Sequence, residues 1–127
     1  MSVPALIETL QVFTTGGTID KEYFDAKSAY EIGEPQIVEL LREAGVSFEI
    51  AVETLMRKDS LDITEADRQV IAERVAASPH RCVIVTHGTD TMAATAHVVA
   101  DALAEAEAEH TVVFVGSLAP ARFKASD

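Results

Sequence analysis

Two short loops of this chain bring together hydroxyl groups, glycines and a carboxylate. Thr15 to Asp20 (TGGTID) follows an apolar run from Leu10 to Thr14, and Thr86 to Thr91 (THGTDT) follows a second run that begins at Cys82. Glycine allows a sharp turn whose backbone N–H groups point outward, where they can hold a developing oxyanion. A threonine hydroxyl becomes a nucleophile when a neighbouring base or hydrogen-bond chain activates it. The two loops therefore favour attack on a carbonyl.

An ordinary structural explanation also exists for these residues. Gly-Gly turns are common, and Thr18 can satisfy local backbone groups within one. Asp90 is either the cap of the following helix or a carboxylate that binds a ligand. For His87, which precedes a glycine, we expect a backbone-positioning or core role rather than that of a base. The Gly-Gly segment is not a Walker loop, because no Gly-Lys-Ser/Thr follows it. The other histidines lack the spacing of metal ligands, so no metal site is predicted.

Strand and helix patterns alternate along the chain. The expected strands are Leu10 to Thr14, Ser47 to Leu55, Cys82 to Thr86 and Thr111 to Val115. The expected helices are Pro35 to Gly45, Thr64 to the residue before Pro79, and Asp90 to Glu109. Such alternation predicts one three-layer α/β domain over residues 1–127, Rossmann-like or flavodoxin-like, with helices on both faces of a parallel sheet. The expected strand order is 2-1-3-4.

The helix boundaries carry local signals. Thr64 followed three residues later by Asp67 is a variant of the capping box. Gly45 is the expected stop of the first helix. The side of the second helix that faces the sheet is expected to be its apolar stripe. That stripe consists of Val70, Ile71, Val75 and Ala76.

The loops that follow parallel strands open at one edge of a sheet, and ligands bind there where the strand order reverses. The order 2-1-3-4 places the two threonine loops side by side. The first of them continues from Thr15 to Glu34, about 20 residues, which is long for a compact domain and favours an active-site lid. Tyr30 in this segment is either a partly buried ring or a phenol close to Thr18. Ser60, in the loop from Met56 to Ile63, is either part of a polar connection or a contact for a small substrate.

Composition restricts the partners and the compartment. The 127 residues are 48% hydrophobic and 24% charged, as in a globular domain, and the net charge is −11. Such a surface repels phosphate backbones and anionic membranes, so neither nucleic acid nor a membrane is an expected partner. The one cysteine, Cys82, lies in an apolar run and fits a reducing compartment. Without a signal-peptide pattern or about 20 consecutive apolar residues, a cytoplasmic location is expected.

These motifs together resemble the bacterial-type L-asparaginase family. Thr15 to Ile19 (TGGTI) and Thr86 to Met92 (THGTDTM) match its two specific motifs in order and separation. Three further segments resemble the lid of that family, its substrate-holding loop and the segment after its fourth strand. They are Lys27 to Tyr30 with Gly33, Asp59 to Asp62, and Gly116 to Pro120. The resemblance covers nearly the whole chain and is greatest to a short, single-domain subgroup.

The resemblance implies an amidohydrolase that converts L-asparagine and water to L-aspartate and ammonia, without a cofactor. Carried over to this chain, Thr18 is the primary nucleophile and Tyr30 its activating neighbour. Thr89 is the second catalytic threonine, and Asp90 grips the amino group of the substrate. The implied assembly is a homo-oligomer, a dimer or tetramer.

The same resemblance implies the residues that hold the substrate. Ser60 is expected to hold its carboxylate, and the other expected contacts are Gly17, Gly88 and Asp59. Leu61 stands where many members have glutamine or serine, and an apolar side chain there cannot form hydrogen bonds, so binding of glutamine is expected to suffer.

In the family a lysine on a later loop pairs with Thr89 and Asp90. Its position falls beyond Asp127, and Lys124 does not match it, so we expect a truncated chain without the C-terminal part of the family. Two alternatives therefore remain beside the asparaginase. One is a catalytically silent relative that binds aspartate or asparagine, and the other is an amidotransferase-type subunit that hydrolyses the amide of glutamine.

Overall fold

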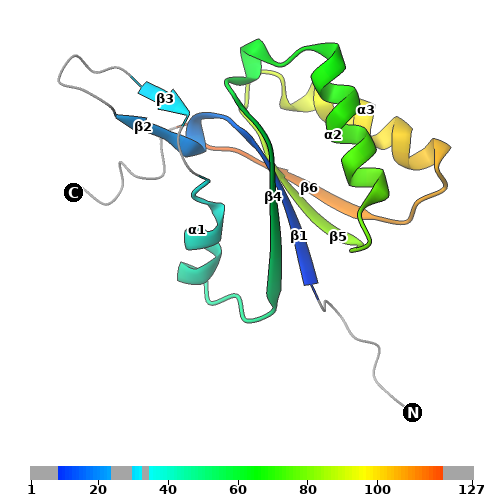
Figure 1. Cartoon of the computed structure of the whole chain (residues 1–127), viewed down its shortest axis with the longest axis horizontal. Coiled ribbons are helices and arrows are strands. Elements are labelled where there is room, and N and C mark those ends of the chain that lie inside the picture. Colours follow the sequence, from blue (N-terminus) through cyan, green and yellow to red (C-terminus); the bar gives the residue numbers. More distant parts are fainter. Residues whose placement is uncertain (1–8, 24–29, 33–34, 119–127) are drawn as a thin grey trace.

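The computed structural model describes residues 9–23, 30–32 and 35–118, and for residues 21–23 and 30–32 it describes the backbone alone. Its centre is a sheet of four parallel strands in the order β4-β1-β5-β6 (Figure 1). The strands are β1 (Thr9–Gly16), β4 (Glu49–Lys58), β5 (Cys82–Thr86) and β6 (Thr111–Val115). Counted among themselves along the chain, they have the predicted order 2-1-3-4, so the α/β fold class expected from the sequence is confirmed.

Helices cover both faces of this sheet. The helices are α1 (Ile37–Glu43), α2 (Glu65–Ala77) and α3 (Met92–Glu105). In Figure 1, α1 lies on one side of the sheet and α2 and α3 lie on the other. Successive side chains of a strand point to opposite faces, so Val12 packs in one core with Ile37, whereas Phe13 packs in a second core with Ile71. Because β1 is covered on both faces, its residues from Leu10 to Gly16 are all buried rather than alternately buried and exposed.

β4 extends to Lys58, three residues beyond its predicted end at Leu55. The register between β1 and β4 shifts between Thr14 and Gly16, so that Gly16 pairs with Lys58. An irregularity of this kind leaves no trace in the alternation of side chains, and the prediction therefore ended too early. The extra residues bring the end of β4 alongside the TGGT loop, where Lys58 pairs with Gly16.

α2 begins and ends as expected but buries a different face. The Thr64 hydroxyl accepts a hydrogen bond from the Asp67 amide at 3.1 Å, and the Asp67 carboxylate accepts one from the Thr64 amide at 2.9 Å, which is the predicted capping box. The predicted stripe is wrong at Val70, which is 45% exposed. The buried residues instead follow the spacing i, i+3, i+4, i+7 of a single helical face. They are Arg68, Ile71, Ala72 and Val75.

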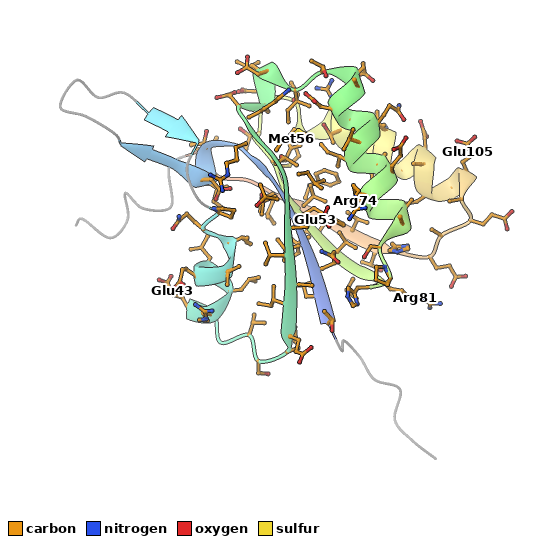
Figure 2. The ribbon with its side chains drawn as sticks, viewed as in Figure 1. Glu43, Glu53, Met56, Arg74, Arg81 and Glu105 are labelled. Carbon is orange, nitrogen blue, oxygen red and sulfur yellow. The ribbon has the colours of Figure 1, made fainter. Side chains whose placement is uncertain are left out.

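An ion pair joins α2 to the edge of the sheet. Arg74 of α2 and Glu53 of β4 face each other (Figure 2). The guanidinium donates two hydrogen bonds to the carboxylate, at 3.0 and 2.6 Å. Since both side chains are about half exposed, water and salt screen the pair, and it contributes more to orientation than to stability.

The segment after β1 is not the structureless loop that the sequence suggested. Thr18–Asp20 form a 3-10 turn, η1, and β2 (Lys21–Tyr23) pairs antiparallel with β3 (Tyr30–Ile32) in a separate two-stranded sheet. The Asp20 carboxylate is buried and accepts a hydrogen bond from the backbone N–H of Gln36 at 2.8 Å. This bond connects the base of the hairpin to the start of α1. The other expected lid residues, Lys27 to Ala29 and Gly33, lie outside the described residues.

The ends of α1 and α3 share one geometry. In α1, Gly45 follows the last turn with a φ of 80°, as the predicted stop. α3 begins at Met92 rather than at Asp90 and ends at Glu105 rather than at Glu109. It is followed by Glu107 with a φ of 52°, and the two hydrogen bonds of a Schellman motif close it, from Glu107 to Ala104 and from Ala108 to Leu103. Glutamate therefore occupies a left-handed position that favours glycine.

Replacing Glu107 by glycine is expected to raise the free energy of unfolding by about 1 kcal/mol, because glycine has no Cβ to clash in the left-handed region. The matched control is Glu105→Gly, which removes the same charge at the last residue of α3 and should lower the free energy of unfolding by about 0.5–1 kcal/mol. Urea denaturation of both variants measures the difference. Equal effects of the two substitutions would show that charge, rather than backbone conformation, decides stability here.

Candidate active site

The loops after β1 and β5 touch through their glycines. Gly17 has a φ of 90°, and a Cβ built on it would lie 2.6 Å from the backbone nitrogen of Gly88. A side chain at position 17 is thus excluded both by its backbone conformation and by the neighbouring backbone. This contact brings the TGGT and HGTDT loops together at the carboxyl edge of the sheet.

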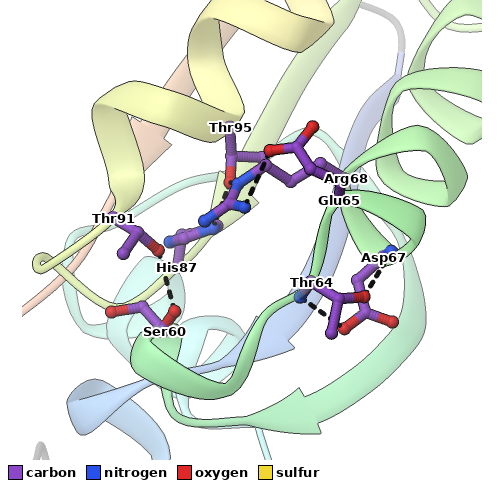
Figure 3. A network of polar contacts seen from close by, with 8 residues as sticks. All are labelled: Ser60, Thr64, Glu65, Asp67, Arg68, His87, Thr91 and Thr95. Carbon is purple, nitrogen blue, oxygen red and sulfur yellow. Dashed lines mark hydrogen bonds and ion pairs between the residues drawn. The ribbon is translucent and has the colours of Figure 1, made fainter.

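The loop after β4 contacts the loop after β5 through Ser60. This residue is the first of the 3-10 turn η2 (Ser60–Asp62). A Cβ built on Gly88 would lie 2.7 Å from both Cβ and Oγ of Ser60. The Thr91 hydroxyl donates a hydrogen bond to the Ser60 carbonyl at 2.8 Å (Figure 3). Ser60 is 1% exposed, and its own hydroxyl has no hydrogen-bond partner among the described residues. Its serine oxygen thus lies buried against Gly88 with unused hydrogen-bonding capacity.

The loop after β6 completes the edge. The His87 amide donates to the Val115 carbonyl at 2.9 Å, which continues the pairing of β5 with β6 by one residue. A Cβ built on Gly116 would lie 2.5 Å from the His87 carbonyl oxygen and 3.1 Å from Cγ2 of Thr89. The loops after β1, β4 and β6 therefore converge around the segment from His87 to Thr89, which belongs to the loop after β5.

The two threonines at the ends of the TGGT motif have different surroundings. Thr15 is buried, and its hydroxyl donates to the Thr86 carbonyl at 2.7 Å, so that it joins β1 to β5. Thr18, the first residue of η1, is half-buried. The hydroxyl of Thr15 is thus used in holding the sheet, and Thr18 is the threonine of this loop that reaches the surface.

The exposed residues of the second loop are Thr89 and Asp90, between β5 and α3. The N-cap of α3 is Thr91, so the alternative explanation of Asp90 as the helix cap is wrong. The chain needs one more residue than expected to turn from β5 into α3, because Thr91 is occupied with the Ser60 carbonyl. Asp90 therefore has no capping task and presents its carboxylate at the edge.

The remaining expected site residues are placed less directly. Asp59 is the N-cap of η2, and its carboxylate accepts a hydrogen bond from the Leu61 amide at 3.1 Å, so part of its capacity serves the local turn. Tyr30 lies in β3 opposite Tyr23, and its phenol falls outside what the structure describes. Leu61 projects into solvent with 72% of its surface exposed.

A buried polar row supports the loop from below. His87 is fully buried, with Nδ1 2.7 Å from the Gly88 carbonyl oxygen and Nε2 2.8 Å from the Thr95 hydroxyl (Figure 3). Arg68 Nε donates to the same hydroxyl at 3.1 Å. His87 therefore lies in the core of the domain with both ring nitrogens in contact with polar groups of the protein. Arg68 and Thr95 were not predicted as functional residues. A signal for them exists, because each occupies a buried position of its helix where a hydrophobic residue is usual.

Charges near the TGGT loop are paired. Lys58 accepts a backbone hydrogen bond from the Gly17 amide at 3.0 Å, while its ammonium group lies 2.7 Å from the Asp67 carboxylate. The hydrogen bond from Lys58, helped by that from the Thr64 amide, lowers the pKa of Asp67. One lysine thus holds the Gly-Gly turn through its backbone and α2 through its side chain.

Within residues 9–23, 30–32 and 35–118, no group of three or more His, Cys, Asp or Glu residues could hold a metal ion. None of the helices in the same part of the chain is long and apolar enough to cross a membrane.

A parallel α/β domain with threonine-bearing loops gathered at its carboxyl edge is the architecture of an asparaginase N-terminal domain. The family model for that domain, "Asparaginase, N-terminal", matches residues 9–127, and the chain belongs to the asparaginase family. This confirms the resemblance seen in the motifs. Among curated proteins, no match was found.

Solved structures show the same fold. The thermostable L-asparaginase from Thermococcus kodakarensis is 25% identical with a TM-score of 0.67, over 89% of this chain and 35% of that one. The probable cytoplasmic L-asparaginase from Campylobacter jejuni is 26% identical with a TM-score of 0.58, over 90% and 34%. L-asparaginase I from Vibrio cholerae is 23% identical with a TM-score of 0.63, over 91% and 35%, and shows the fold alone. The chain spans about a third of each of these proteins.

Substituting Gly17 by alanine is expected to destabilise the chain by more than about 2 kcal/mol, because the added methyl group meets the backbone of Gly88. Gly45→Ala is the matched control, since Gly45 has a similar φ of 80° and open space around its missing Cβ. That variant should lose only about 1 kcal/mol from backbone strain. Denaturant unfolding of both proteins separates the two causes, and similar losses would contradict a close contact of the loops.

The stability of the chain is expected to fall as the pH drops below about 6.5. Burial lowers the pKa of His87, the hydrogen bond to Gly88 opposes this, and the Arg68 cation lowers the pKa further. Below the ordinary histidine pKa the unfolded chain therefore binds a proton that the native chain does not, and the free energy of unfolding decreases until the native pKa is reached. The lowered pKa of Asp67 has its effect at more acidic pH, where its ion pair is lost.

Denaturant unfolding at a series of pH values measures this dependence. His87→Gln, which cannot titrate, should show a flatter curve in the window just below pH 6.5. Parallel curves for the two proteins would mean that His87 does not carry the effect.

Proposed function

We propose that the chain is the N-terminal part of an amidohydrolase that converts L-asparagine and water to L-aspartate and ammonia through a threonine nucleophile. The observation that carries this proposal is the backbone contact of Gly17 with Gly88, which joins the two threonine loops at one edge. The family membership supports amide hydrolysis, and the similar proteins from T. kodakarensis and C. jejuni are named L-asparaginases.

In this proposal the Thr18 hydroxyl attacks the carbonyl carbon of the substrate side-chain amide. Tyr30 assists the loss of the hydroxyl proton, and that proton leaves with the amide nitrogen as ammonia. The resulting ester between Thr18 and the acyl group is then hydrolysed by water, which releases L-aspartate and restores the threonine. Thr89 from the opposite loop takes part as the second hydroxyl. Backbone amides beside the glycines can hold the oxyanion of each tetrahedral intermediate.

The proposed substrate contacts fit the charges of an amino acid. Asp90 is exposed at the edge without a capping task, and its carboxylate suits the substrate ammonium group. The Ser60 hydroxyl, which has no hydrogen-bond partner in the part of the chain that the structure describes, lies next to Gly88 and suits the substrate carboxylate. Gly17 and Gly88, which bring the two loops together, are the proposed backbone contacts of the substrate, and Asp59 supports Ser60 by capping its turn. No cofactor enters this reaction.

Asparagine is preferred over glutamine in this proposal because of Leu61. It follows Ser60 directly and exposes an apolar side chain that offers no hydrogen bond to a longer amide. A glutamine-hydrolysing, amidotransferase-type subunit is therefore the weaker alternative. The silent binder keeps the same contacts for aspartate or asparagine and differs only in the absence of turnover.

A homo-oligomer in the cytoplasm completes the proposal. Within the described residues, β4 and β6 are the edge strands of the sheet, and the unpaired backbone groups of edge strands favour association. The location agrees with the C. jejuni protein, which is described as probably cytoplasmic.

The test is release of ammonia from L-asparagine by the purified chain, measured by a coupled assay. Thr18→Ala should lower turnover by about a hundredfold or more while binding of L-aspartate, followed by calorimetry, changes little. Thr111→Ala removes an exposed threonine at the opposite end of β6 and serves as the control with unchanged turnover. Wild-type turnover by the Thr18 variant would overturn the nucleophile assignment. Binding of aspartate by an intact wild-type chain that releases no ammonia would identify the silent binder.

A further inference from the structure

A row of buried polar groups runs from α2 through α3 to the loop after β5. Arg68, Thr95 and His87 are 8%, 0% and 0% exposed. The Arg68 guanidinium also lies 3.1 Å from the exposed carboxylate of Glu65 (Figure 3). The row therefore begins at the surface, and it ends at the Gly88 carbonyl. The three side chains come from three different elements, and nothing in the proposed chemistry uses them.

The hydrogen bonds of this row can be directed in one way only for a neutral imidazole. A carbonyl oxygen only accepts, so Nδ1 of His87 carries the proton and donates to Gly88. Nε2 then has a lone pair and accepts from the Thr95 hydroxyl. That hydroxyl oxygen accepts in turn from Arg68 Nε. All three bonds therefore point from the guanidinium to the carbonyl, and bonds in such a chain polarise one another in the same sense.

The orientation of one peptide group follows from this chain. The peptide bond between Gly88 and Thr89 is planar and trans, so its C=O and N–H groups point in opposite directions. When His87 holds the carbonyl inward, the Thr89 amide must point away from the buried row. Gly88 is also confined by Ser60 on its other side, which leaves this peptide little freedom to rotate.

Stability alone does not account for a buried arginine in this place. Desolvation of a guanidinium is costly, and a hydrophobic side chain of similar size often packs at least as well. What arginine adds is a fixed donor that fills one acceptor position of Thr95, so that the threonine proton is directed to His87.

We propose that Arg68, Thr95 and His87 are positioning residues that fix the Gly88–Thr89 peptide and thereby place Thr89 and Asp90 for reaction. The inference rests on the proposed amide hydrolysis, because its purpose is the placement of those two residues. The direction of the hydrogen-bond chain, in contrast, is a property of the folded protein and can be measured whether or not the chain turns over asparagine.

Three variants at buried threonines isolate the chain of hydrogen bonds. Thr95→Val keeps the shape of the side chain and removes the hydroxyl, and Thr95→Ser restores a hydroxyl. Thr86→Val is the matched control, because the Thr86 hydroxyl is buried and has no hydrogen-bond partner among the described residues. Arg68→Met tests the donor at the start of the chain while keeping an apolar stem. Thermal unfolding of each variant establishes that it is folded at the assay temperature.

Imidazole ¹⁵N spectra supply a measurement that does not depend on activity. In the wild-type chain, His87 Nδ1 should be protonated, and Nε2 should resonate as an unprotonated nitrogen that accepts a hydrogen bond. In Thr95→Val, Nε2 should move to the position of an unprotonated nitrogen without such a bond, and the Thr89 amide resonance should shift. Thr95→Ser should return both signals toward wild type, and Thr86→Val should leave the Nε2 signal unchanged. A protonated Nε2 in the wild-type chain would overturn the inference outright.

The kinetic readout follows the same set of variants. Thr95→Val and Arg68→Met should lower kcat for L-asparagine by about tenfold or more while KM changes less, because a misplaced loop harms the transition state more than ground-state binding. Thr95→Ser should recover most of the rate. Equal losses in Thr95→Val and Thr86→Val would mean a general packing defect and would overturn the positioning role. If the wild-type chain releases no ammonia, the proposed function fails, and the spectra with the Thr89 amide shift alone decide whether the row orients the peptide.

Discussion

The close backbone contact between Gly17 and Gly88 is the constraint on which the site depends. Two loops that belong to different crossovers can share one small substrate only if their backbones approach without side chains between them. A Cβ on either glycine would overlap a neighbour, at Gly88 in one case and at Ser60 in the other. The distance between the two loops therefore depends on the missing side chains of Gly17 and Gly88, and the surrounding sheet must keep the loops at that distance.

The sheet does so through hydroxyl groups as well as through its hydrophobic cores. At the carboxyl end of the central strand, Thr14 bonds to Thr54 of β4 at 3.0 Å and Thr15 bonds to the Thr86 carbonyl of β5. The bond between Thr14 and the exposed Thr54 is partly buried, whereas Thr15 and Thr86 are both buried, so the bond between them lies in a region from which water is largely excluded. Polar contacts in such surroundings are directional and costly to break, which gives the edge a defined geometry.

Much of the fold could be predicted from the sequence because local signals and topology agree. The apolar runs located β5 and β6 at their observed bounds, the capping box located α2, and the strand order followed from alternating units. The predicted elements were wrong where a contact between residues distant in the sequence determines where an element begins, ends or pairs. Thr91 bonds to Ser60 and delays the start of α3, the irregular pairing of Gly16 prolongs β4, and the segment after β1 forms a hairpin through pairing that no periodicity announced.

The candidate site could be predicted only in part for a similar reason. Residue types drew attention to Thr18, Thr89 and Asp90, which the structure places in two adjoining loops. Arg68 and Thr95 escaped notice because a polar residue inside a helix pattern is usually read as surface, and its burial becomes visible only when three elements meet.

The pairing of the strands divides at this edge. The backbone of β1 continues with β4, from Gly17 to Lys58, whereas the backbone of β5 continues with β6, from His87 to Val115. Between β1 and β5 at this edge, the backbone hydrogen bonds give way to the bond from the Thr15 hydroxyl to the Thr86 carbonyl and to the contact of Gly17 with Gly88. This division is confined to the carboxyl edge, because β1 and β5 are paired from Leu10 to Thr14 below it and both cores contain residues of β1 and of β5. A small displacement of one loop against the other at this edge would therefore change the separation of the two threonine loops without breaking the pairing of β1 with β5.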